Sequence, residues 1–485
     1  MQNLNKHILI TQCSQASVTG QQLLNLPERI LQFGNGVLLR GLPDYYVDQA
    51  NKQGVFNGRI VVVKTTPGNV EDFAKQDYLY THYIKGIQEG MLIDTVQINA
   101  AISRVLPAES AWSEILNCAE NPGINIVFSN TTEQGLVYLE EKTGTGVPAS
   151  FPGKLMEYLF HRFNHLGFDE SSKMCIIPTE LIEFNGDKLK QFIFDLSSYN
   201  QKPEKFTEWL ISHVLFCNSL VDRIVPGKPD RDKLQQYELE QQYTDQYLIE
   251  SEPYNLWAIE GPEMLHQILG FAQCNPGIKI TEDISLYKEL KLRLLNATHT
   301  FTAAKALLTG HKTVFETMSD QAFFPFISSL TEEIKKAIPK EIPQELKNRF
   351  DADVLDRFRN ANIRHYWSSI IFNYAEKFKI RCMPLIRYFY TKNAHFAPFM
   401  TEGLAAYFKV TMPDLKENDV YYTIIHGEKI RLNDPLSPHI FDFKNQFGIE
   451  ALIREHIENY LLEEGSAKEI EDLIKDVIRC FHSLN

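Results

Sequence analysis

Short apolar runs alternate with helical patterns in the first part of the chain. Residues 29–33, 59–64, 125–129 and 173–177 are such runs, and each predicts a buried strand; residues 96–105 predict a further one. Strands that are separated by helices pair in parallel, because a parallel connection has to cross back over the sheet. The alternation therefore predicts an α/β fold with a Rossmann-type, doubly wound parallel sheet.

The pattern changes near residue 281, after which long helical segments dominate. A turn signal with Pro276 and Gly277 precedes the change, so we place a domain boundary within 275–282. The charged segment 332–349 is expected to be a solvated helical stretch that is interrupted at its two prolines. We thus expect a dinucleotide-binding domain over 1–280 and a mainly α-helical substrate and catalytic domain over 281–485.

Composition narrows the possible partners. The 485 residues include 49 basic and 62 acidic side chains, which gives a formal net charge of −13. This balance argues against nucleic acid or an anionic membrane as the main partner, although a locally basic pocket for a small anion remains compatible with it. No obligate protein partner is evident from the sequence.

Seven scattered cysteines, none in a C-x-x-C pair, favour reduced thiols over a disulfide framework or a structural zinc site. The first residues lack a long apolar run and a cleavage site, and no stretch of about 18 apolar residues predicts a membrane span. We therefore expect a cytoplasmic protein. No metal-ligand pattern is found, so chemistry without a metal is expected.

A glycine-containing loop follows the first predicted strand. Gly34-Asn35-Gly36 precedes a helical pattern, and glycines at this point let backbone N–H groups approach a pyrophosphate. Leu39 stands at the third glycine position, so the match to G-x-G-x-x-G is incomplete. The loop is either a dinucleotide-binding loop or a plain turn, and its place in the first βα unit favours the former.

The segment 284–308 reads as a helix that carries Lys291, Asn296 and His299. At roughly 100° per residue, Asn296 lies about 140° and His299 about 80° around the axis from Lys291. The three side chains can then reach one cleft, where the lysine moves a proton and the others bind the oxygen that it serves. The alternative is that these are solvated or snorkelling side chains, which are common on helices.

Several motifs together resemble the polyol-specific long-chain dehydrogenases, the mannitol dehydrogenase family. The resemblance runs from about residue 28 to at least residue 385, and its most specific part is the K-x-x-x-x-N-x-x-H element. Segments 76–81, 129–133, 178–186 and 216–227, the last containing V-D-R-I-V-P, add to it.

The resemblance implies an NAD-dependent oxidoreductase with a particular set of site residues. Lys291 would be the acid/base, with a pKa lowered by desolvation, and Asn296 and His299 would hold the reacting oxygen. Asn69 stands where NAD-preferring members can carry an aspartate, which predicts weak exclusion of NADP. The residues expected to bind NAD are Phe33, Gly34, Asn35, Gly36, Asn69 and Thr132, and those expected to bind substrate are Asp222, Arg364 and Lys377.

Within the family, the chain is most similar to the branch that reduces tagaturonate to altronate. Mannitol and fructuronate members usually carry Asp and Asn where this chain has Glu180 and Leu181, and the family's later arginine is replaced by Ser369. A sugar acid needs a cation for its carboxylate; Arg364 is favoured, and Lys377 and Arg381 are the other candidates. A fructuronate reductase, a mannitol or other polyol 2-dehydrogenase, and a non-catalytic dinucleotide-binding sensor remain the alternatives.

Overall fold

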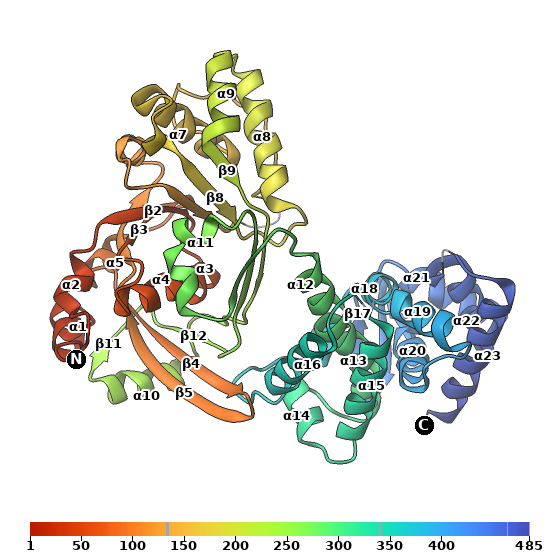
Figure 1. Cartoon of the computed structure of the whole chain (residues 1–485). Helices are drawn as coiled ribbons and strands as arrows, with labels where there is room; N and C mark the ends of the chain where they lie inside the picture. The colour runs from red at the N-terminus through yellow and green to blue at the C-terminus, as the bar shows by residue number, and fades with distance from the viewer. Residues whose placement is uncertain (132–134, 339–340, 463, 485) are drawn as a thin grey trace. The chain divides into compact units, whose positions relative to one another are not determined.

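The structure is a computed structural model that describes residues 1–131, 135–338, 341–462 and 464–484 (Figure 1). The chain forms two compact units. The first unit contains Met1–Lys85 and Ile93–Ile284, and the second contains Gly86–Leu92 and Ser285–Asn485. The short segment Gly86–Leu92 is the tip of a hairpin, and within the second unit the Gly90 N–H donates to the Asp356 carboxylate at 2.9 Å.

A six-stranded parallel sheet forms the centre of the first unit, with the order β6-β3-β2-β7-β8-β9. The predicted doubly wound sheet is confirmed, and its four most apolar runs coincide with β2, β3, β7 and β8. The strands are β2 (Glu28–Phe33), β3 (Arg59–Lys64), β6 (Ile102–Pro107), β7 (Ile126–Ser129), β8 (Met174–Pro178) and β9 (Val214–Phe216).

The prediction of a single strand over 96–105 was wrong. β5 (Met91–Asn99) ends at Asn99, and β6 begins at Ile102 in a different sheet. The Asn99 side chain accepts a hydrogen bond from the Ala101 N–H at 2.9 Å and donates to the Asp44 carbonyl at 3.0 Å. A side chain that bonds to its own backbone two residues on competes with the strand ladder, which explains the break.

Alternate residues of each central strand enter two separate cores. Ile30, Val62 and Phe128 belong to one core, which also contains residues of α4, β10 and β13. Leu31 and Val63 belong to the other core, which is covered by α7, α8 and α9 (Figure 1). Both faces of the sheet are therefore buried, as a parallel sheet requires.

Helices and smaller sheets complete the first unit. β4 (Tyr80–Gln88) lies between β5 and β12 (Ile249–Ser251), while β13 (Leu256–Glu260) lies between β10 (Ser219–Asp222) and β14 (Ile278–Thr281); β1 (Gln2–Asn3) pairs with β11 (Tyr243–Thr244). The helices are α1 (Lys6–Gln12), α2 (Gly20–Leu24), α3 (Val37–Gly41), α4 (Pro43–Lys52), α5 (Glu71–Lys75), α6 (Trp112–Asn117), α7 (Phe151–Leu166), α8 (Asn185–Tyr199), α9 (Glu204–His213), α10 (Arg231–Gln241) and α11 (Leu265–Ile268).

The second unit is mainly helical, with one antiparallel sheet of β15 (Leu415–Glu417), β16 (Val420–Ile425) and β17 (Glu428–Leu432). Its centre is α13, which packs against α15, α17, α18 and α20. Gly403 permits the contact with α20, because a Cβ there would lie 2.9 Å from the Phe301 ring. The helices are α12 (Ser285–Leu290), α13 (Thr298–Leu308), α14 (Val314–Ser319), α15 (Phe324–Ala337), α16 (Gln344–Phe358), α17 (Trp367–Ile370), α18 (Tyr374–Arg381), α19 (Met383–Asn393), α20 (Pro398–Thr411), α21 (Ser437–Phe447), α22 (Ile449–His456) and α23 (Ala467–Ser483).

The expectation that the charged segment 332–349 is solvated was wrong in part. Glu333, Lys335 and Lys347 are buried. The Glu333 carboxylate accepts the first backbone N–H groups of α20, and Lys335 forms an ion pair with Asp351 at 2.9 Å. Charges become buried where a helix end or an opposite charge satisfies them, and these partners are distant in the sequence.

Gly186 is where α8 approaches the backbone that follows β9. A Cβ at this position would lie 2.4 Å from the Cys217 carbonyl carbon. We expect Gly186→Ala to lower the free energy of unfolding by about 1–3 kcal/mol, because backbone has to move. Gly270→Ala is the control, since its Cβ would meet nothing closer than 3.7 Å. Urea unfolding of both variants measures the effect, and equal midpoints would contradict the tight contact.

Candidate active site

The glycine loop lies at the carboxyl end of β2. Gly34 has φ +112°, and a Cβ there would lie 3.0 Å from the Asn130 carbonyl oxygen, so this position requires glycine. Leu39, which replaces the third glycine, is buried beneath the loop. Pro43 occupies the first turn of α4, where its missing N–H and fixed φ are tolerated.

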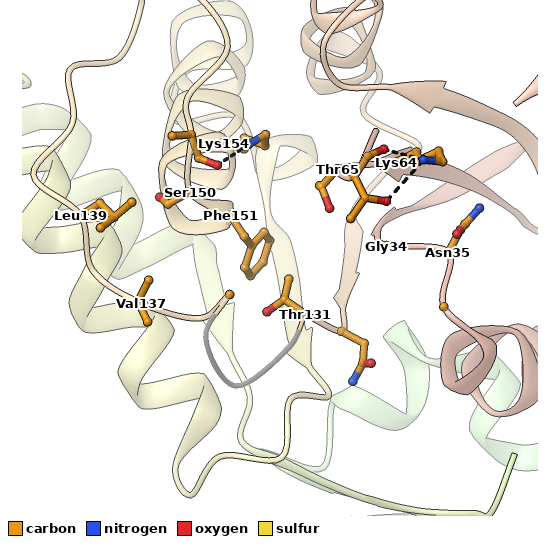
Figure 2. Close-up of a pocket in the computed structure, with 15 residues that line it drawn as sticks. Gly34, Asn35, Lys64, Thr65, Thr131, Val137, Leu139, Ser150, Phe151 and Lys154 are labelled. Atoms are coloured by element: carbon orange, nitrogen blue, oxygen red, sulfur yellow. Dashed lines mark hydrogen bonds between the residues drawn. The ribbon is translucent and has the colours of Figure 1, made fainter. Parts of the chain in front are cut away.

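A cavity of about 470 Å³ opens beside this loop, which is within the usual range of small-molecule sites (Figure 2). Its described lining contains two lysines and several hydroxyl and amide groups but no carboxylate. The lining residues are Gly34, Asn35, Gly36, Lys64, Thr65, Thr66, Asn130, Thr131, Gly135, Val137, Leu139, Ala149, Ser150, Phe151 and Lys154.

The two lysines are held by backbone carbonyls of neighbouring turns (Figure 2). Lys64 ends β3 and donates to the Thr66 and Pro67 carbonyls. Lys154, in the first turn of α7, donates to the Pro148 and Ala149 carbonyls, and burial lowers its pKa. Because these partners are neutral, both ammonium groups leave the cavity with a positive potential that suits phosphate groups.

Buried polar groups support the loop from behind. The Gln32 side-chain amide donates to the Gly34 carbonyl at 3.3 Å and to the Asp44 carboxyl at 3.5 Å. Burial raises the pKa of Asp44 to about 8, although Arg40 opposes the shift. Among the described residues, Gln32 Oε1 and Asp44 Oδ1 have no hydrogen-bond partner. One proton on the Asp44 carboxyl would satisfy both oxygens if it bridged them.

The carboxyl ends of β7 and β8 form the next part of the site. Glu180 is buried and accepts hydrogen bonds from the Thr131 N–H at 2.9 Å and the Ser129 hydroxyl at 3.1 Å. Asn185 donates to the Pro178, Glu180 and Ser219 carbonyls, at 3.0 to 3.1 Å. Glu180 therefore positions Thr131 at the cavity, while Asn185 fixes the loop in which Glu180 lies.

The residues predicted to bind the cofactor have different surroundings. Gly34, Asn35 and Gly36 line the cavity. Phe33 is fully buried and its ring packs against Phe151 at 5.1 Å, whereas the Asn69 side chain accepts a hydrogen bond from the Glu71 N–H at 2.7 Å. Neither of these two is among the lining residues, and Thr132 lies outside the described residues.

The V-D-R-I-V-P segment contributes a structural cation beside a predicted substrate residue. Asp222 ends β10 and is buried. Arg223 donates to the carbonyls of Glu252 at 3.0 Å and Gly41 at 2.7 Å, and its guanidinium lies over the Tyr45 ring. The arginine thus connects β10 to the end of the helix that follows the glycine loop.

In the second unit, Lys291 and Asn296 lie on a π-helical turn, η4 (Lys291–Ala297), between α12 and α13. The prediction of uniform α-helix was wrong for this turn. A π-turn forms hydrogen bonds between residues five apart, so Asn296 lies about one turn beyond Lys291 instead of about 140° around the axis. Such turns occur frequently at functional sites. His299 follows in the first turn of α13.

His299 is enclosed by aromatic rings. It stacks on Phe358 at 4.2 Å and meets His365 and Trp367 edge-on. Burial lowers its pKa well below the usual histidine value, and the basic groups of His365, Arg357 and Arg381 lower it further. Its Nε2 is buried without a hydrogen-bond partner among the described residues, so a neutral imidazole has one nitrogen to offer a ligand.

The cationic side chains that are candidates for binding the substrate carboxylate differ in how exposed they are to solvent. Arg364 is exposed, whereas Lys377 and Arg381 are half-buried on α18. Lys377 Nζ donates to the Ile370 carbonyl at 2.9 Å, and Arg381 Nη1 lies 3.4 Å from the Thr300 hydroxyl.

Comparison with known proteins identifies the family. A model of the mannitol dehydrogenase Rossmann domain matches residues 28–271, and a model of the mannitol dehydrogenase C-terminal domain matches 283–477. The chain belongs to the mannitol dehydrogenase family. As a member of this family it is an oxidoreductase that acts on CH–OH groups.

Two similar members of the family are altronate oxidoreductases. The protein of Halalkalibacterium halodurans is 39% identical over 385 residues, which cover 79% of this chain and 74% of the relative. The protein of Bacillus subtilis is 35% identical over 389 residues, which cover 80% of this chain and 78% of the relative.

Solved structures of the family share the fold. Mannitol 2-dehydrogenase of Pseudomonas fluorescens, in a ternary complex with NAD and D-mannitol, superposes with a TM-score of 0.64 at 22% identity, over 99% of this chain and 96% of that one. A D-sorbitol dehydrogenase superposes with a TM-score of 0.72 at 17% identity, over 98% of this chain and 100% of that one. The glycine loop and its cavity fit a dinucleotide cofactor. Among the described residues, no helix of this dehydrogenase is long and apolar enough to cross a membrane.

The raised pKa of Asp44 makes stability depend on pH. Between about pH 4, where the unfolded carboxyl ionises, and about pH 8, the folded state holds a proton that the unfolded chain releases. The free energy of unfolding contributed by Asp44 therefore falls as pH rises through this window. We expect Asp44→Asn, whose amide can donate to Gln32 Oε1, to gain stability relative to the parent as pH rises.

Thermal unfolding at pH 5.5 and 8.5 tests this expectation. The difference in Tm between Asp44→Asn and the parent should move in favour of the variant at the higher pH. Asp232→Asn, at an exposed position of α10, is the control and should show no such change. An equal pH dependence for Asp44→Asn and the parent would mean that Asp44 is ionised in the folded state.

Proposed function

We propose that the chain reduces D-tagaturonate to D-altronate with NADH, in a reversible reaction. The proposal is supported by its similarity, over about four-fifths of its length, to proteins named altronate oxidoreductase. The π-turn is the observation that supports the catalytic roles. Lys291 and Asn296 lie about one turn apart on it, and His299 follows in the first turn of α13.

Lys291 is the proposed acid/base. In the reduction it donates a proton to the carbonyl oxygen, and in the oxidation it takes the proton from the carbinol. Asn296 donates a hydrogen bond from its amide to the same oxygen and so stabilises developing negative charge. Bound NADH supplies the hydride for the carbonyl carbon.

His299 acts as a neutral group in this proposal. Its ring has a hydrogen bond with the backbone of Leu295, which leaves the orphan Nε2 as an acceptor when the imidazole is neutral. Nε2 therefore accepts from a substrate hydroxyl beside the reacting carbon. This contact orients the sugar acid, because an aromatic enclosure leaves the imidazole little freedom to rotate.

Replacement of Lys291 tests the assignment of the acid/base. We expect Lys291→Ala to lower turnover by about 10²–10⁴-fold, the usual contribution of a general acid or base, with NADH affinity largely unchanged. Turnover is followed by nicotinamide absorbance and affinity by fluorescence. Lys392→Ala, at an exposed position of α19, is the control. Turnover within a few-fold of the parent would exclude Lys291 as the acid/base.

Cofactor discrimination gives a second test. NAD is the proposed cofactor, held by Gly34, Asn35 and Gly36, with Lys64 and Asn69 near the end of β3, where NADP carries its additional phosphate. We expect Asn69→Asp to lower kcat/KM for NADPH more than for NADH, because a carboxylate repels that phosphate; Asp retains the hydrogen bond from Glu71. Lys64→Met should change the same ratio. If the ratio of kcat/KM for NADPH to that for NADH stayed unchanged in both variants, the ribose 2′-position of the cofactor would lie away from Asn69 and Lys64.

A substrate panel separates the remaining possibilities. Ketohexuronates and neutral ketoses are offered with NADH, and sugar acids and polyols with NAD. Preference for D-tagaturonate supports the proposal, whereas preference for D-fructuronate, or for fructose and mannitol, identifies another branch of the family. Cofactor binding without turnover on any of them would favour a dinucleotide-binding sensor.

A further inference from the structure

α18 carries two cations on one side. Lys377 and Arg381 are four residues apart, so their side chains lie on the same face of this helix. Burial lowers the pKa of both groups, and the charge of Arg381 lowers that of Lys377 further. Among the described residues, neither group has a carboxylate within ion-pair distance; they contact the Ile370 carbonyl and the Thr300 hydroxyl instead.

α18 lies next to the helical segment that carries Lys291, Asn296 and His299. α18 packs against both η4 and α13. Thr300, which Arg381 approaches at 3.4 Å, donates to the Asn296 carbonyl at 2.7 Å and directly follows His299. Besides burial, the groups that lower the pKa of His299 are His365, Arg357 and Arg381, all of them basic. The Arg381 guanidinium therefore lies beside the first turn of α13, which contains His299 and follows Asn296.

Two half-buried like charges at this spacing repel each other, and an anion that binds to both relieves this repulsion. A neutral polyol offers no such anion, but the carboxylate of a sugar acid does. A guanidinium can bind both carboxylate oxygens, whereas an ammonium provides a single point charge. Exposed Arg364 would have to lose its solvation to do the same.

We propose that Arg381, assisted by Lys377, binds the substrate carboxylate and selects sugar acids over neutral sugars. The proposal rests on the proposed function for the identity of the sugar acid. Arg381 then binds the carboxylate end of the substrate, which does not react, while Asn296 and His299 bind the reacting end. Substrate length follows from this division, since the carboxylate has to reach α18 while the carbonyl is at Lys291.

Substitution of Arg381 tests the proposal, because it should change kcat/KM for a charged substrate and not for a neutral one. We expect Arg381→Met, which keeps the apolar stem, to lower kcat/KM for D-tagaturonate by about 10- to 100-fold, the worth of a hydrogen bond to a charged group. The kcat/KM for neutral D-tagatose should stay constant or rise. Arg381→Lys should recover part of the lost activity. Arg431→Met, at an exposed position of β17, is the control.

A binding measurement keeps the failure of this proposal distinct from failure of the proposed function. We expect D-altronate to raise the Tm of the parent but not of Arg381→Met, with the Tm of each protein without ligand as its own reference. Tagaturonate activity that survives in Arg381→Met, or is lost in Arg364→Met instead, overturns the role of Arg381 alone. Stabilisation by a different sugar acid, dependent on Arg381, overturns only the named substrate. A parent that no sugar acid stabilises overturns both.

Discussion

Successive side chains of β2, β3 and β7 enter opposite cores, and this two-sided burial determines where the chain can place polar chemistry. Neither face of the sheet is available to a ligand, so the site forms at the carboxyl edge, where strands end and loops begin. Gly34, Lys64 and Asn130 all directly follow or end such strands, and all line the same cavity. The hydrophobic pattern thus fixes the position of the cofactor site before any polar residue is considered.

Polar groups at this edge are themselves buried, and their hydrogen bonds hold the glycine loop and the segment after β7 in place. Gln32 connects the Gly34 carbonyl to Asp44, and Glu180 holds the Thr131 N–H. Each of these groups would cost free energy if it lost its partner, so the loops have few alternative conformations. A cofactor that binds here meets a prepared surface, and little of its binding energy is needed to order the protein.

Much of the fold could be predicted from the sequence, because β2, β3, β7 and β8 are apolar runs bounded by clear turns. The features that could not be predicted depend on contacts between distant segments. The α-helical period gives no indication of the π-turn at Lys291–Ala297, where packing against α16 and α18 surrounds the turn. The cavity wall formed by Ser150, Phe151 and Lys154 follows residues 135–149, which contain no helix or strand and have no periodic sequence pattern. The prediction that Lys291, Asn296 and His299 form a site uses only their spacing within one segment, so it does not depend on contacts between distant segments.

In the second unit, the surroundings of Arg381 differ from those of another cation that is removed from solvent. Lys335 in the same unit is also buried, but it has Asp351 and Glu332 as partners, so its charge is satisfied within the protein. Among the residues that the structure describes, Arg381 has a hydroxyl contact and a neighbouring cation but no carboxylate partner. A ligand that supplies the opposite charge would give Arg381 the partner that Lys335 already has, and the carboxylate of the proposed sugar acid is such a group.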